Sequence, residues 1–136
     1  MKCIAIDDEP RALNITENFS EKIDFLCFEA KFRNPLTAIN FLGKNEIDLI
    51  SLDINMSELS GTEFIKVLQR KPLVIFTTAY SEYAVQSYEL DAVDYLLKPF
   101  EFERFLKSVI KARDTLEMKN NKQHINIVTE PVGGVK

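Results

Sequence analysis

The chain has 136 residues, a hydrophobic content of 46% and a formal net charge of -4. A chain of this length forms one domain with its own core, and the composition is that of an ordinary globular protein. The acidic balance, with a pI near 5.1, argues against strong binding of nucleic acid by this chain alone. It contains no apolar run long enough to span a membrane and no secretory signal, so we expect a cytoplasmic location.

Five apolar runs alternate with segments of helical spacing, and each run has the length of a strand. The predicted strands cover residues 3–6, 25–28 with an extension to 32, 47–52, 73–76 and 93–97. A continuous apolar run bounded by polar residues is typical of a parallel strand that is buried on both faces. Strands that alternate with helices in this way predict an α/β protein with a parallel sheet.

Local signals mark the starts of the helices between these strands. The predicted helices begin near Pro10, Pro35, Gly61, Ser81 and Glu101. Asn34 before Pro35 has the form of an N-cap followed by proline at the first helical position. The apolar helix positions expected to face the sheet include Ile15, Leu36 and Val67.

The last helix is expected to end near Met118, because residues 120–123 form a polar break. We therefore assign residues 1–119 to the domain and residues 120–136 to a linker or tail.

A carboxylate, Asp53, follows the third predicted strand directly. An unpaired carboxylate beside a buried strand is costly, so Asp53 requires a partner that carries positive charge. The alternative is that Asp53 only caps the next turn or helix, which is a common role of aspartate. Polar residues at the ends of other predicted strands favour the first interpretation.

Those strand ends carry Asp7, Asp8, Asp53, Thr78 and Lys98. In a parallel sheet the carboxyl ends of all strands meet at one edge, so these side chains are expected to converge. Three carboxylates repel one another unless a cation offsets their charge, and hard oxygen ligands favour Mg²⁺. A carboxylate nucleophile beside a metal, a lysine and a hydroxyl is suited to phosphoryl transfer, with formation of an acyl phosphate.

At these spacings the pairs Asp7-Asp8, Thr78-Ala79 and Lys98-Pro99, together with Asp53, resemble the receiver domain of two-component response regulators. The resemblance covers about residues 1–118 and implies a flavodoxin-like (CheY-like) fold. That fold has a five-stranded parallel sheet of order 2-1-3-4-5 with helices on both faces. Within the family, the chain is similar to LytTR-type (LytR/AlgR-like) regulators in residues 6–10, 76–80, 83–85, 92–100 and 103–105.

The resemblance implies a role for each site residue. Asp53 would accept a phosphoryl group from a sensor histidine kinase, and Asp8, Asp53 and the backbone carbonyl of Asn55 would bind Mg²⁺. Asp7 would act nearby through water. Thr78 and Lys98 would bind the phosphoryl group, and Tyr95 would be an aromatic switch, although a half-buried strand tyrosine is an equally good interpretation. Ser57 departs from the family, which usually has proline there, so the loop after Asp53 is expected to be less rigid.

Two other functions compete with a phosphorylated switch. One is a protein-interaction module of the same fold that is never phosphorylated, in which the charged site residues would have no purpose. The other is an enzyme of the haloacid-dehalogenase type, which normally has a second aspartate two residues after its nucleophile. Here that residue is Asn55, which cannot exchange protons, so we expect a signalling phosphoacceptor that is not an enzyme.

The resemblance also implies partners. Phosphorylation is expected to promote a homodimer through the last helix and the face that carries Tyr83, Tyr88 and Tyr95. Regulators of this type control transcription through a separate C-terminal DNA-binding domain, for which the residues after the last helix are too few. We therefore expect DNA binding only through an output domain that this chain lacks. The alternative is a natural single-domain regulator.

Overall fold

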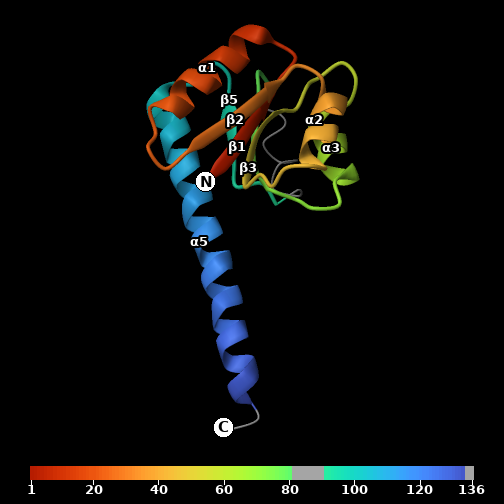
Figure 1. Ribbon diagram of the computed structural model, residues 1–136. Helices are drawn as coiled ribbons and strands as arrows, with labels where there is room; N and C mark the ends of the chain where they lie inside the picture. The colour runs from red at the N-terminus through yellow and green to blue at the C-terminus, as the bar shows by residue number, and fades with distance from the viewer. Residues whose placement is uncertain (81–90, 134–136) are drawn as a thin grey trace.

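Five parallel strands form a single sheet in the computed structural model, which describes residues 1–80 and 91–133, with side chains as far as residue 122. The strand order is β2-β1-β3-β4-β5, as predicted (Figure 1). The strands are β1 (Lys2–Ile6), β2 (Cys27–Phe32), β3 (Leu49–Asp53), β4 (Leu73–Thr78) and β5 (Asp94–Leu97). β2 begins later than predicted because the chain turns after α1, where the Leu26 N–H donates to the Ile23 carbonyl at 3.1 Å.

Helices cover both faces of this sheet, as predicted (Figure 1). They are α1 (Pro10–Glu21), α2 (Pro35–Leu42), α3 (Gly61–Val67) and α5 (Phe102–Gly133). α1 and α5 lie on one face, and α2 and α3 lie on the other. The predicted short helix that begins at Ser81 lies outside the described residues. No helix in the described ranges combines the length and the apolar character that a bilayer crossing requires.

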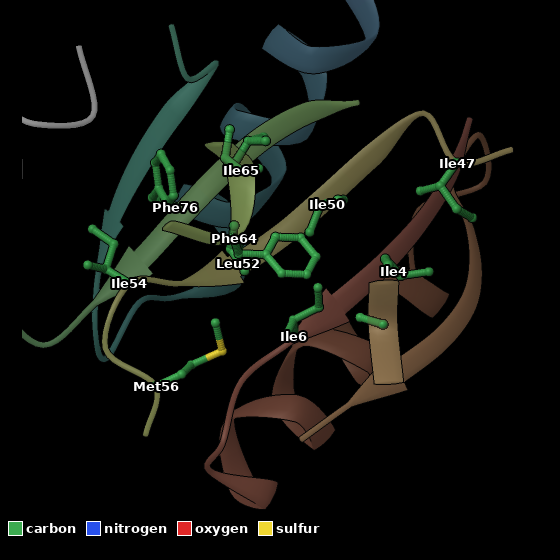
Figure 2. Close-up of a cluster of buried hydrophobic side chains, with 12 residues drawn as sticks. Ile4, Ile6, Ile47, Ile50, Leu52, Ile54, Met56, Phe64, Ile65 and Phe76 are labelled. Atoms are coloured by element: carbon green, nitrogen blue, oxygen red, sulfur yellow. The ribbon is translucent and has the colours of Figure 1, made fainter. Parts of the chain in front are cut away.

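Alternate residues of the central strands supply two separate cores. Ile4, Ile50 and Phe76 pack under α2 and α3 around Phe64, as Figure 2 shows. Cys3, Leu49 and Ile75 point to the opposite face, where they meet Phe105 and Val109 of α5. Because β1, β3 and β4 are buried on both faces, the carboxyl ends of these strands are held rigidly.

Three apolar helix positions that were expected to face the sheet are exposed, whereas Phe19, Ile39 and Phe64 of the same helices pack against the two cores. Ile15, Leu36 and Val67 were expected to face the sheet, but they are 39%, 51% and 57% exposed. The buried positions of these helices include the small residues Thr16, Ser20, Ala38 and Gly61. Small side chains let a helix backbone approach the sheet closely, so the buried face of each helix includes small residues beside large apolar ones such as Leu13 and Phe64.

The end of the last helix was also predicted wrongly. α5 continues to Gly133, through the polar residues 120–123 that were expected to break it. The physical reason is that the chain has neither glycine nor proline between Pro99 and Pro131, so no residue in that stretch strongly opposes helix formation. Figure 1 shows the C-terminal half of α5 leaving the sheet and extending away from the other elements.

Candidate functional site

Three carboxylates meet at the carboxyl edge of the sheet, as predicted. Asp7 and Asp8 follow β1, and Asp53 ends the neighbouring strand β3. One carboxylate oxygen of each residue lies within 4.8 Å of the other two. Asp7 and Asp53 are 6% and 5% exposed, so most of their hydration is lost and the cluster needs positive charge.

Lys98 supplies positive charge from the end of β5. Its ammonium lies 2.7 Å from Asp7 Oδ2 and 3.7 Å from Asp53 Oδ1. The backbone N–H of Lys98 donates to the Thr78 carbonyl at 2.7 Å, which continues the pairing of β5 with β4 past the last strand residue. Lys98 is therefore held by its backbone as well as by its charge.

The electrostatics of the cluster act most strongly on Asp53. Burial, followed by the charge of Asp7, raises the pKa of Asp53 to about 7, while Lys98 and the Asn55 N–H oppose this rise. The Asn55 N–H donates to Asp53 Oδ1 at 3.2 Å. Asp53 therefore holds a proton more readily than an ordinary aspartate does, and a bound cation would favour the ionised form.

The donor set of this cluster fits a hard divalent cation. Three carboxylates supply oxygen atoms close enough to share one ion, and oxygen is the ligand that such cations prefer. The cluster has only one ion-paired cation among the described residues, so its negative charge is not fully balanced.

The remaining predicted residues lie around this cluster. Thr78 is fully buried at the end of β4, and its Oγ1 accepts a hydrogen bond from the Tyr80 N–H at 3.1 Å. Tyr95 is partly buried on β5, and its hydroxyl donates to the Tyr80 carbonyl. Tyr80 is thus bound both by Thr78, which was predicted to bind the phosphoryl group, and by Tyr95, which was predicted to be a switch.

A cleft opens beside the cluster between α1 and the loop after β5. Its volume is about 220 Å³, and Asp7 and Lys98 line it together with Ile15 and Phe100. The lining of the cleft is therefore both charged and apolar. A molecule that enters here reaches the ion pair between Lys98 and Asp7 from solvent.

Gly61 contributes to the site, although the sequence indicated only that a helix begins near it. Its N–H donates to the Ile54 carbonyl at 2.8 Å, which brings α3 against the strand end that carries Asp53. Ser60 and Glu63 form a capping box at the start of this helix. The Ser-x-x-Glu spacing was a signal that could have located this cap from the sequence.

A polar cluster on β5 and α5 was not predicted. Arg104 binds both carboxylate oxygens of Asp94, at 2.8 and 3.0 Å, and Ser108 Oγ donates to Asp94 Oδ2 at 2.6 Å. Burial raises the pKa of Asp94, but the hydrogen bonds from Arg104, Ser108 and the Tyr95 N–H outweigh it and hold the pKa at about 2. We call Asp94, Arg104 and Ser108 the β5–α5 clamp.

Residues 3–110 match the family described as "Response regulator receiver domain". The chain belongs to this family. It is a receiver domain, a signalling phosphoacceptor that is not a conventional enzyme, and the predicted fold and family are confirmed. The acidic pocket of Asp7, Asp8 and Asp53 is consistent with a phosphorylation site.

Named relatives support the more specific resemblance to LytR-type regulators. The receiver domain is 36% identical over 128 residues to "Sensory transduction protein LytR" of Staphylococcus haemolyticus. The match covers 92% of this chain and 50% of that protein. The domain is 36% identical over 124 residues to "Transcriptional regulatory protein LytR" of Staphylococcus aureus, covering 89% of this chain and 50% of that protein. The chain thus spans about half the length of these relatives.

A solved structure agrees with the fold. The response regulatory domain of protein mrkE from Klebsiella pneumoniae superposes with a TM-score of 0.78 at 32% identity. The match covers 87% of this chain and 99% of that chain. Nearly the whole of that regulatory domain therefore has a counterpart in the present fold.

Proposed function

We propose that Asp53 of this receiver domain accepts a phosphoryl group from a sensor histidine kinase, and that the acyl phosphate changes the conformation of the domain to control transcription. One observation carries the proposal. The buried Asp53 carboxylate lies beside two further carboxylates and 3.7 Å from the Lys98 ammonium. A carboxylate activated in this way is suited to attack phosphorus, and the lysine is suited to bind the transferred group.

In the proposed step, an ionised Asp53 oxygen forms a bond to phosphorus while the bond from phosphorus to the kinase histidine nitrogen breaks. The electron pair of that bond stays on the imidazole, which then takes up a proton. Lys98 binds an oxygen of the phosphoryl group as a point charge, and the Thr78 hydroxyl donates to another. To do so, Lys98 exchanges part of its pairing with Asp7 for the phosphoryl oxygen.

We propose Mg²⁺ as the cation of the acidic cluster. Asp8, Asp53 and the backbone carbonyl of Asn55 would hold it, and Asp7 would bind through water. When bound, Mg²⁺ supplies positive charge that stabilises both the ionised carboxylates and the phosphoryl oxygens. The close approach of three carboxylate oxygens supports this assignment. Among the described residues, Lys98 is the one cation that forms an ion pair with them.

The test is intact-mass measurement after incubation with a small phosphodonor. Wild type with Mg²⁺ is expected to gain one phosphoryl group, and chelation of Mg²⁺ is expected to abolish the gain. Asp53→Asn keeps the shape of the side chain but removes the nucleophile, so no gain is expected. A wild-type protein that never gains mass under these conditions would support the alternative of a non-phosphorylated interaction module.

We further propose that the wider regulator is about twice as long as this chain and that residues 120–133 of α5 connect the domain to a DNA-binding output domain. The support is the length of the LytR relatives and the words "transcriptional regulatory protein" in one of their names. The chain alone is then expected not to bind DNA specifically, because its net charge is -4. Titration into labelled duplex DNA at low and moderate salt tests this, and a sequence-dependent micromolar complex would contradict it.

Phosphorylation is also proposed to promote a homodimer through the face formed by Tyr95 and α5. Tyr83 and Tyr88, which were predicted to share this face, lie outside the described residues. The support is the contact of the Tyr95 hydroxyl with the Tyr80 carbonyl, directly after the strand that carries Thr78. Sedimentation with and without a phosphoryl mimic measures the change in mass. The same mass in both conditions would argue against a phosphorylation-dependent dimer.

A further inference from the structure

The β5–α5 clamp lies outside the phosphoryl site, and none of the roles proposed so far involves it. Asp94 is the first residue of β5, and Lys98 follows the last residue of that strand. Arg104 and Ser108 are one helical turn apart on α5, so they face the strand together. Any contact that fixes β5 along its own axis therefore also influences where Lys98 lies.

β5 is an edge strand of only four residues, with β4 as its one neighbour in the sheet. The clamp engages its outer side at Tyr95. The Tyr95 N–H donates to Asp94 Oδ1 at 2.8 Å, and the Tyr95 carbonyl accepts from Arg104 Nη2 at 3.1 Å. A backbone amide and carbonyl at the sheet edge are thus bound to side chains in the position where a further strand would otherwise bind.

The three side chains of the clamp also bind one another. Arg104 Nη1 donates to Ser108 Oγ at 3.0 Å, while Ser108 Oγ donates to Asp94 Oδ2. Ser108 is fully buried and the Asp94 side chain is 12% exposed, so water competes little for the bond between them, whereas the Arg104 side chain is 45% exposed and its pairing is partly screened by solvent. A bidentate pairing of arginine with a carboxylate fixes direction as well as distance.

Burial of β5 does not depend on the clamp. Leu96 is fully buried and packs in the same core as Phe105 and Val109 of α5, which already holds the strand against the helix. Apolar contact of this kind is not directional and allows small sliding movements. The clamp adds the directional contacts that apolar packing lacks.

We propose that Arg104 and Ser108 are positioning residues for Lys98, because they fix strand β5 from its outer side and so fix the ammonium beside Asp7 and Asp53. The Lys98 ammonium lies 2.7 Å from Asp7 and 3.7 Å from Asp53, so a shift of the strand that carries it changes both distances. A displacement of about 1 Å at a reacting group reduces a rate by up to about 100-fold. This role rests on the proposed function of Lys98 in phosphoryl transfer.

The first test compares phosphorylation rates at saturating acetyl phosphate and Mg²⁺. Arg104→Gln is expected to react about 10-fold more slowly, and Ser108→Ala is expected to show a smaller decrease. Arg113→Gln is the control, because Arg113 is also a half-exposed α5 arginine but contacts the ring of Phe25 instead of β5. The Mg²⁺ affinity is expected to be unchanged in all three, since the proposed metal ligands follow β1 and β3. A parallel loss of Mg²⁺ affinity and rate would indicate general damage and overturn the proposal.

The second test asks whether Arg104 acts through Lys98. In a Lys98→Ala background, Arg104→Gln is expected to lower the rate no further, because the group that it positions is already absent. If the two effects multiply, Arg104 does not act through Lys98.

The third test needs no phosphorylation, so it separates this proposal from the proposed function. In nitrogen-15 NMR of the lysine ammonium groups, the Lys98 signal of the wild type is expected to shift or broaden in Arg104→Gln and to remain unchanged in Arg113→Gln. An unchanged Lys98 signal in Arg104→Gln overturns the positioning role even if the wild type is phosphorylated. A wild type that is not phosphorylated contradicts the proposed function alone.

Discussion

The Cα atom of Gly61 packs against the backbone carbonyl of Asp53 so closely that a Cβ atom at position 61 would lie 2.5 Å from that oxygen. The same Cβ would lie 3.0 Å from the Cα of Ile54. Both neighbours are backbone atoms of the strand end that carries the proposed phosphoacceptor, so neither can rotate away. The start of α3 and the position of Asp53 are therefore set together.

Gly61→Ala is expected to lower the free energy of unfolding by about 1–3 kcal/mol and to slow phosphorylation, because the added methyl group displaces the backbone of Asp53. Gly43→Ala is the control. A Cβ at that position meets nothing closer than 3.5 Å, and the residue has an ordinary helical φ of -69°. Urea unfolding of both variants measures the difference. Equal stabilities would show that α3 shifts without resistance.

Asp53→Asn is expected to stabilise the metal-free protein, and increasingly so as the pH rises. The folded state raises the pKa of Asp53 to about 7 from about 3.9 in an unfolded chain. Between these values the folded protein keeps a proton that the unfolded chain releases, so stability falls as the pH rises through this window. The asparagine removes that loss, which is on the order of a few kcal/mol at most. Thermal melts at pH 5 and pH 8 with a chelator measure it; a gain that is larger at pH 5 would contradict the sign.

Mg²⁺ is expected to raise the melting temperature more at pH 8 than at pH 5. At the lower pH the ion must displace a proton from Asp53, whose pKa is about 7, whereas at the higher pH the carboxylate is already ionised. Asp8→Asn removes a proposed ligand and is expected to reduce the shift at both pH values. A shift that does not depend on pH, in protein with an intact Asp8, would argue that Mg²⁺ binds elsewhere.

Asp94→Asn is expected to lower stability at pH 7 by about 1–2 kcal/mol, a value reduced by solvent screening of the pair with Arg104. The pKa of Asp94 is depressed to about 2, so its contribution is fully present above the unfolded value of about 3.9 and is lost as the pH falls toward 2. The difference between wild type and Asp94→Asn should therefore shrink in acid. Urea unfolding at pH 7 and pH 3 provides the comparison, and a constant difference would exclude an ionic origin.

The strand ends were predictable because burial on both faces makes each strand a continuous apolar run, so Asp53 and Lys98 stand out where the runs stop. The burial of Thr16 in α1 and of Ala38 in α2 was not predicted, because neither side chain is large and apolar. The contact of Gly61 with Asp53 depends on tertiary approach of two backbones, which no local pattern encodes.

The β5–α5 clamp could not be predicted from the sequence for a different reason. Arg104 and Ser108 are four residues apart, as polar pairs on a solvated helix face often are, and only the position of Asp94 shows that both bind the same carboxylate. The prediction for α5 was too short because residues 120–123 are polar, but they include no helix-breaking residue.

α5 has 32 residues, which at 1.5 Å per residue gives a rod about 48 Å long. Its first turns are held by β5, and its far half stands clear of the sheet (Figure 1). A lever of this length magnifies small rotations: tilting its base by about 5° moves its tip by about 4 Å. We therefore expect an ångström-scale rearrangement around Tyr95 to move the tip of α5 by several ångströms, at a point far from Asp53.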